Sequence, residues 1–304
     1  MVHILVVGNP VYSRIETPQL APGPRTLSGC ATNACLGIAR LGSRATLIGA
    51  ISDDFAPDFL AVLGQEGVTV TRCPSTATGG FHIRYDTVGT RTLRPIALAD
   101  AIPPSVMLPA RVDGVIIGPI FNEVSVELVR AVRRATQAPL LLDPQGLLRT
   151  IESGQVCLAR TAAFDAIASL VDIIKVSEDE AHVITGIDPR DDPVAAAHAL
   201  HALGGKLSIV TLAERGSVIV DGNTVYRIPA FRSDVVDPTG AGDLYASGWM
   251  LQYVENPEDL VSAGVVATAM ASLMVEHRGP GFPMSISVVK QRAAALRIDV
   301  ITQG

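Results

Sequence analysis

The chain has 304 residues, of which 48% are hydrophobic and 18% charged; this excludes intrinsic disorder and allows one large α/β domain or two smaller ones. Lys and Arg number 24 against 30 Asp and Glu, a net charge of −6, and the basic residues are scattered, so we expect no nucleic-acid partner. The four cysteines form no CxxC pair, which favours a reduced compartment and no structural zinc.

The first apolar segment, residues 4–7, lacks a charged region before it and ends at Gly8-Asn9-Pro10. We interpret it as a buried strand and not as a signal peptide. No apolar run reaches the roughly 18 residues that span a bilayer. We therefore expect a soluble, cytoplasmic protein without a membrane partner.

Apolar β-rich runs then alternate with helical patterns along nearly the whole chain. The predicted strands are residues 4–7, 45–51, 114–117, 140–142, 173–175 and 207–212. The predicted helices are residues 32–41, 123–136, 161–170, 193–203 and 244–251. This alternation is typical of an α/β fold with a doubly wound, mostly parallel sheet between layers of helices.

Two segments break the alternation, residues 11–27 and residues 78–96, the second around a predicted turn at Thr87-Val88-Gly89. Both are interpreted as extended pieces outside the main sheet. Because each flanks a core strand, we expect them to pair into a small β lid over one end of that sheet. The chain shows no internal repeat and no low-complexity linker, so a single domain over residues 1–304 is predicted.

The strongest local motif is V-D-P-T-G-A-G-D at residues 236–243, directly before a helical pattern. Backbone N–H groups at Gly240, Ala241 and Gly242 would converge on an anion such as phosphate, and the helix dipole would add positive potential. A phosphate would repel Asp243 unless this carboxylate accepts the proton of an attacking hydroxyl. The alternative is a tight turn, with Asp243 as an ordinary first-turn acid.

The segment from Asp237 to Asp243 resembles the second signature of the ribokinase/PfkB carbohydrate kinase family. Residues 28–33, running into Ala39-Arg40-Leu41-Gly42, resemble the first. Further matches follow in the family's order at residues 49–55, 89–92, 143–144, 178–181 and 210–216. The resemblance implies a ribokinase-like α/β fold with a β lid, and transfer of the γ-phosphoryl group of ATP to a hydroxyl.

On this resemblance, Asp243 is the catalytic base and the backbone of Gly240, Ala241 and Gly242 is an anion hole. With the resemblance included, the catalytic interpretation of Asp243 outweighs the helix-start one. The lid would cover the substrate and keep water from competing for the phosphoryl group.

The resemblance also implies residues for the nucleotide and for metals. Ser177 and Glu180 stand where the family often has Asn-x-x-Glu, whose Glu helps to hold hydrated Mg²⁺; Ser-x-x-Glu is equally a helix capping box. Thr211, Gly216 and Thr268 match the adenosine side of the site, although Ala213 replaces a usual Gly, and Thr268 could simply pack in its Ala-rich helix.

A monovalent cation such as K⁺ is a further expectation. Asp237 and Thr239 match positions that supply ligands to such an ion in many relatives. The alternative, held as equal, is that Asp237 only stabilises the turn before the anion hole.

Gly29 and Asn33 match substrate contacts, and Arg91 in the lid could contact a polar substrate group. The alternatives are a helix cap for Asn33 and a solvated strand residue for Arg91. Ser13 stands where ribose-type kinases have an acid that grips a sugar diol, and Ser28 replaces a Gly. Ribose is therefore disfavoured.

A finer resemblance, carried by residues 118–123, 143–149 and 275–280, is to the branch with plant myo-inositol kinases and uncharacterised sugar kinases. We expect a sugar or polyol acceptor, with a nucleoside as the alternative. The substitutions at Ser13, Ser28, Ser177 and Ala213 keep open a binding or regulatory protein without turnover. Relatives often pair through the lid strands, and an exposed edge there would benefit from pairing; a homodimer is one alternative, and the oligomeric state stays open.

Overall fold

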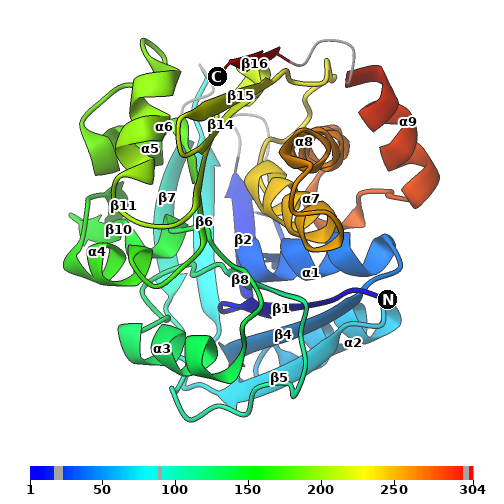
Figure 1. Ribbon diagram of the computed structural model, residues 1–304. Coiled ribbons are helices and arrows are strands. Elements are labelled where there is room, and N and C mark those ends of the chain that lie inside the picture. Colours follow the sequence, from blue (N-terminus) through cyan, green and yellow to red (C-terminus); the bar gives the residue numbers. More distant parts are fainter. Residues whose placement is uncertain (17–22, 88–90, 297–300, 304) are drawn as a thin grey trace.

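The computed structural model describes residues 1–16, 23–87, 91–296 and 301–303. Short apolar runs form most strands of a ten-stranded sheet (Figure 1). The strand order is β16-β15-β14-β13-β12-β9-β8-β1-β4-β5. Neighbours from β5 to β13 are parallel, and β13 to β16 are antiparallel. The strands are β1 (His3–Val7), β4 (Arg44–Ile51), β5 (Thr69–Pro74), β8 (Gly114–Ile117), β9 (Leu140–Leu142), β12 (Ile173–Ser177), β13 (Leu207–Thr211), β14 (Ser217–Asp221), β15 (Thr224–Ile228) and β16 (Ile301–Gln303).

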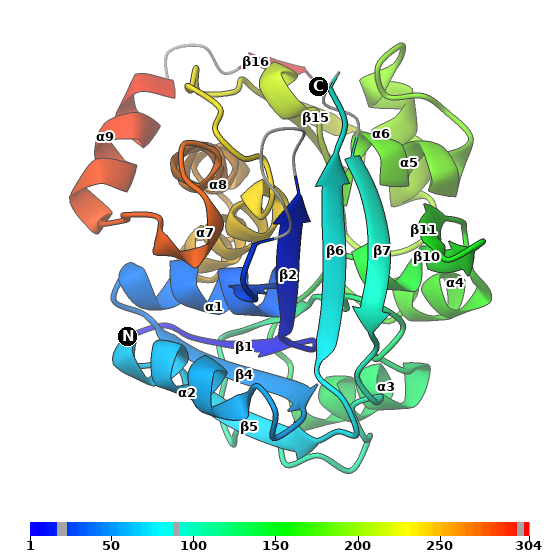
Figure 2. The same ribbon diagram turned by 180° about the vertical axis from the view of Figure 1, so that it is seen from behind.

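Helices cover both faces of this sheet, as Figures 1 and 2 show from opposite sides. One layer contains α1 (Cys30–Arg40), α2 (Ala56–Gln65), α7 (Ala241–Glu255), α8 (Leu260–Val275) and α9 (Ile286–Leu296). The other contains α3 (Val126–Ala135), α4 (Ala162–Ala168), α5 (Glu178–Thr185) and α6 (Pro193–His201). Each layer shares one large apolar core with its face of the sheet. The predicted doubly wound, mostly parallel fold is confirmed.

The central strands are buried along their length, which explains why they are apolar at every position and do not alternate. The hairpin of β14 and β15 was not predicted, although Asp221-Gly222 between two β-rich runs is a turn signal. The edge strand β5 was also missed, because its sequence TVTRCP mixes polar and apolar residues.

Several predicted boundaries were wrong by a few residues. The helix predicted over residues 123–136 begins at Val126, where the Ser125 hydroxyl accepts a hydrogen bond from the Leu128 N–H. Glu123 lies before it, and its carboxylate accepts backbone N–H groups from Asn9, Ile120 and Phe121. The helix predicted over residues 32–41 starts two residues earlier, at Cys30, and the one predicted over residues 244–251 runs from Ala241 to Glu255. For α3, the Ser125 cap and the loop contacts of Glu123 set the start of the helix.

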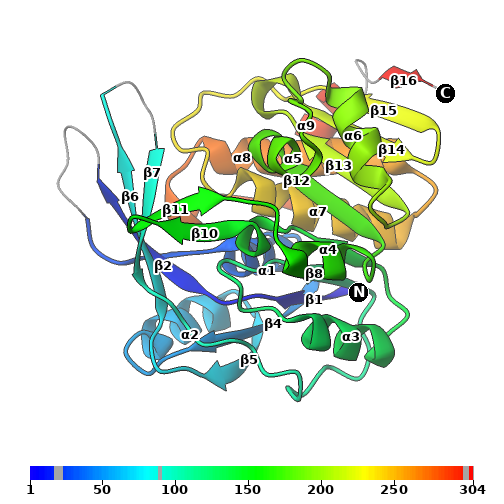
Figure 3. The same cartoon turned by 90° about the vertical axis from the view of Figure 1, so that its left-hand side faces the viewer.

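A second sheet, which we call the lid, stands against one side of the molecule (Figure 3). Its strands are β2 (Val11–Glu16), β3 (Thr26–Ser28), β6 (Gly79–Tyr85) and β7 (Arg91–Ala97), in the order β3-β2-β6-β7. The two segments expected to pair do so, through parallel contacts between β2 and β6. The predicted turn at Thr87-Val88-Gly89 lies partly outside the described residues.

A hairpin of β10 (Arg149–Glu152) and β11 (Gln155–Leu158) lies beside β7. Three short 3₁₀ turns complete the described elements: η1 (Gln145–Leu147), η2 (Ala213–Arg215) and η3 (Gly279–Gly281). No helix in the described part of the chain has the length and apolar character needed to cross a membrane.

Candidate active site

The start of α7 is the centre of the candidate site. Gly240 caps the helix with a positive φ of 90°, and the Asp237 carboxylate accepts the Thr239 N–H at 2.9 Å in the turn before it. The first-turn N–H groups of Gly242 and Asp243 have no acceptor within the helix. Together with the helix dipole, these donors make a position suited to an anion.

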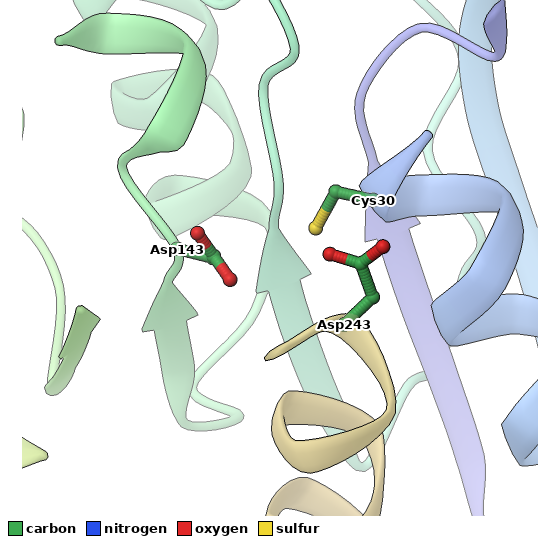
Figure 4. Close-up of side chains that lie close together, drawn as sticks. All are labelled: Cys30, Asp143 and Asp243. Carbon is green, nitrogen blue, oxygen red and sulfur yellow. The ribbon is translucent and has the colours of Figure 1, made fainter. Parts of the chain in front are cut away.

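Asp243 projects from this turn into a buried polar cluster. Its Oδ2 accepts a hydrogen bond of 2.8 Å from Asn33 Nδ2 on α1. Figure 4 shows Asp243 facing Cys30 and Asp143. Cys30 is the first residue of α1, and Asp143 directly follows β9. One ligand atom of each of these three residues lies within 4.8 Å of the others. Residues far apart in the sequence thus meet at the carboxyl ends of the strands, where sites form in this class of sheet.

The surroundings raise the pKa of Asp243 above its ordinary value. Burial is the main cause, the nearby Asp143 carboxylate adds to it, and the Asn33 hydrogen bond, Lys175 and Cys30 oppose it. Burial, together with the Asp243 and Asp143 carboxylates, raises the pKa of the Cys30 thiol well above its usual range, so the thiol stays protonated. Asp243 is consequently a stronger proton acceptor than an exposed aspartate.

Lys175 and its partner Asp143 were absent from the predicted site residues. Lys175 Nζ lies 2.8 Å from Asp143 Oδ2, and each side chain is only 4% exposed. Burial opposes the charged amine, but Asp143 and Glu180, with Asp243, outweigh it and raise the pKa of Lys175. The sequence signal was present: Lys175 interrupts the buried apolar strand Ile173–Ser177.

A first cavity of about 200 Å³ lies between the lid and the start of α7. Its lid side is mostly apolar, lined by Val11, Ser13, Phe81, Ile83 and Leu93. Its floor is polar, lined by Gly29, Asn33, Asp143, Lys175 and Asp243. The structure therefore brings the predicted substrate residues Gly29 and Asn33 to one cavity with Asp243. The side chain of Arg91 lies outside the described part, so its predicted contact stays a prediction.

A second cavity, of about 600 Å³, lies on the other side of the same helix start. The predicted nucleotide residues Ser177, Thr211, Gly216 and Thr268 line it. Its apolar wall comes from Ala230, Phe231, Tyr245, Ala271 and Val275. Ser177, Pro238 and Gly242 line both cavities, so the two spaces meet at the anion-binding turn.

Glu180 does not line the second cavity, unlike the other predicted nucleotide residues; it lines the first. It forms the capping box that its sequence predicts: its carboxylate accepts the Ser177 N–H at 2.8 Å, and the Ser177 hydroxyl accepts the Glu180 N–H at 3.5 Å. Burial and, next, Asp143 raise the pKa of Glu180. The capping alternative is thus observed, and the carboxylate also borders the cavity.

Ala213, which replaces a usual Gly, has a positive φ of 47°. This left-handed conformation costs a non-glycine residue about 1–2 kcal/mol of stability. A glycine avoids that strain but raises the conformational entropy of the unfolded chain, which lowers stability by about 0.4–1 kcal/mol. We expect Ala213→Gly to stabilise the protein by about 0.5–1 kcal/mol in urea denaturation. The matched control is Ala294→Gly, on the exposed face of α9, which should lose about 1 kcal/mol. Equal losses in both variants would show that Ala213 is unstrained.

Known proteins similar to this chain include carbohydrate and nucleoside kinases. A model described as pfkB family carbohydrate kinase matches residues 16–287. Fructokinase-1 of Oryza sativa subsp. japonica is 26% identical over 306 residues, covering 93% of this chain and 92% of the relative. A nucleoside kinase of Methanothermobacter thermautotrophicus is 26% identical over 298 residues, covering 91% of this chain and 90% of the relative.

Solved structures share the fold. A pyrophosphate-dependent kinase in the ribokinase family, complexed with a pyrophosphate analog and myo-inositol, has a TM-score of 0.82 at 22% identity, covering 95% of this chain and 99% of its own. Arabidopsis thaliana ribokinase complexed with ribose and ATP has a TM-score of 0.78 at 21% identity, covering 96% and 99%. The ribokinase-like fold is thereby confirmed.

Proposed function

Because this chain belongs to the pfkB family of carbohydrate kinases, which transfer a phosphoryl group to a hydroxyl, we propose that it transfers the γ-phosphoryl group of ATP to a small sugar or polyol. One observation carries the proposal. The two cavities meet at the first turn of α7, and the buried carboxylate of Asp243 faces the smaller one. A hydroxyl in one cavity and a phosphate in the other would approach each other at that turn.

In this mechanism Asp243 accepts the proton of the acceptor hydroxyl as the oxygen attacks phosphorus. The backbone donors of Gly240 and Gly242 would stabilise the charge on the transferring group. The Ala241 N–H, predicted for the same anion hole, donates to the Pro238 carbonyl oxygen at 3.2 Å. ADP, the leaving group, stays bound in the larger cavity until it is released. The lid would exclude water, and the raised pKa of Asp243 supports its role as base.

Glu180 is the residue we assign to Mg²⁺. The ion usually takes one or two carboxylates as ligands and keeps several waters. The Glu180 carboxylate, at the wall of the cavity, can serve as one of these ligands. Bound there, Mg²⁺ would neutralise charge on the donor phosphates. Asp237 and Thr239 line a cavity of about 20 Å³ that adjoins the acceptor cavity and shares Thr239 with it. This space is large enough for one water-sized ion, which supports the K⁺ proposal.

ATP is the preferred donor because of the larger cavity's apolar wall. Phe231, Ala271 and Val275 give a surface that a nucleobase can cover. Pyrophosphate, the donor named for one structural neighbour, carries only charged oxygens and would leave this wall bare. Thr211, Gly216 and Thr268 line the same cavity, as expected for the adenosine side.

The acceptor cavity suits a small polyhydroxylated ring. Its volume of about 200 Å³ corresponds to about seven waters at ~30 Å³ each. Phe81 and Leu93 can cover the apolar face of such a ring, while Asn33 and Asp143 can bind its hydroxyls. A sugar or cyclitol therefore fits better than a nucleoside.

The test is acceptor-dependent ADP release by the purified protein, over a panel of sugars, inositols and nucleosides, with ATP or pyrophosphate as donor and a reaction without acceptor as control. We expect turnover with ATP and a sugar or polyol. Turnover only with nucleosides would support the nucleoside kinase alternative, and turnover only with pyrophosphate would refute the donor assignment. Ligand binding without product would support a regulatory protein.

A further inference from the structure

We propose that Lys175 is a catalytic residue whose ammonium group contacts the phosphoryl group during transfer, held in place by Asp143. The proposal rests on the kinase function proposed above. It assigns a reactive role to a side chain that lies outside the two signature motifs. Three observations carry it: the position of the amine, the charges around it, and the nature of its ion pair.

The amine lies directly against the anion-binding turn. Lys175 is on β12, between the apolar residues Ile174 and Val176, and its amine extends to the floor of the acceptor cavity. A Cβ built on Gly242 would be 2.6 Å from Lys175 Nζ, so the ammonium borders the backbone of that glycine. The helix start and the ammonium therefore direct positive potential at the same point.

The local charges require a cation at this point. Asp143, Glu180 and Asp243 are all buried around Lys175 and interact electrostatically with its amine. A phosphoryl group adds negative charge beside these carboxylates, which would repel it. Arg149 also lines the cavity, but it has no atom within 4 Å of a Cβ built on Gly242, whereas Lys175 has two. Lys175 is therefore the better placed cation to offset the repulsion.

Replacing the ion pair with uncharged residues separates a catalytic from a structural role. A buried pair that only stabilises the fold can often be replaced by uncharged residues at little cost. Here the Asp143 carboxylate fixes the amine between the end of β9 and the start of α7. Asp143 thus acts as a positioning residue for the ammonium.

The step balances without a further reagent. The bond between the acceptor oxygen and phosphorus forms, the bond between phosphorus and the ADP oxygen breaks, and the hydroxyl proton passes to Asp243. Lys175 keeps its protons and donates hydrogen bonds to the non-bridging oxygens, on which charge is spread in the transition state.

The experiment measures kcat, KM and ADP affinity for Lys175→Met. We expect kcat to fall by about 10²–10³-fold, as when one donor to a transition-state oxyanion is removed. ADP affinity should change less than about threefold, whereas the tighter binding of ADP with aluminium fluoride, a mimic of the transferring group, should be lost. Lys175→Arg, which keeps the charge, should recover part of kcat. Lys206→Met, at a side chain that is 78% exposed, is the matched control and should equal wild type.

Met at position 175 leaves Asp143 as an unpaired buried charge, which could unfold the protein. The double variant Lys175→Met with Asp143→Asn removes that charge and should fold, yet remain as slow. A kcat within about threefold of wild type in either folded variant would overturn the proposal. An inactive wild type would instead refute the kinase function, and the role of Lys175 with it.

Discussion

The substitution Asp243→Asn should reduce phosphoryl transfer by about 10²–10⁴-fold, the usual contribution of a positioned general base. The amide keeps the shape of the carboxylate but cannot accept the hydroxyl proton. Since the larger cavity lies on the other side of the helix start, ATP affinity should stay near that of wild type. Steady-state kinetics and calorimetric titration with ATP measure the two effects.

The variant should also be at least as stable as wild type. A raised pKa means that the ionised carboxylate is less favourable in the folded than in the unfolded chain, so neutralising it removes an unfavourable charge. Glu127→Gln is the control, because it removes an exposed first-turn acid from α3 and should not alter kcat. Equal turnover in Asp243→Asn and wild type would leave Asp243 as no more than a helix-start acid.

The second large effect is expected from Gly240→Ala. A Cβ at Gly240 would lie 2.6 Å from Met274 Cε and 2.8 Å from Asn33 Nδ2, and the φ of 90° is strained for any side chain. Because Asn33 donates to Asp243, displacing it moves the base. We expect kcat to fall about 10²-fold, as small misplacements at reacting groups do, and stability to fall by at least about 1–2 kcal/mol.

Gly42→Ala separates these two effects. Gly42 has a similar positive φ of 74°, but nothing lies within 4 Å of a Cβ there. This variant should therefore lose stability through backbone strain and keep kcat. If both variants lost stability equally and both kept kcat, the position of Asn33 would have no part in transfer.

The central parallel strands and several helices were predictable from local sequence, because their signals need no distant partner. Runs such as residues 114–117 and 140–142 became buried parallel strands, and the Ser-x-x-Glu pattern at Ser177 formed a capping box. The motif residues Asn33 and Asp243 were assigned to the site, and they meet in a hydrogen bond across 210 positions of sequence.

The roles of residues that depend on contacts between distant parts of the sequence were not predictable. Lys175 and Asp143 are 32 positions apart, and no local pattern pairs them. Gly216 was assigned to the nucleotide, yet a Cβ there would lie 1.9 Å from the Ile228 carbonyl oxygen, a packing requirement set by another strand. The exact lid contacts of Arg91 depend on a side chain outside the described residues.

The central claim is that Asp243 activates an acceptor hydroxyl for attack on the γ-phosphorus of ATP. Its most direct test is a single-turnover reaction with γ-labelled ATP and an acceptor from the sugar and polyol panel, run with wild type and Asp243→Asn at saturating nucleotide. We predict that label appears on the acceptor with wild type, and at least about 10²-fold more slowly with the variant. Transfer at equal rates, or no label on any acceptor with wild type, would contradict the account.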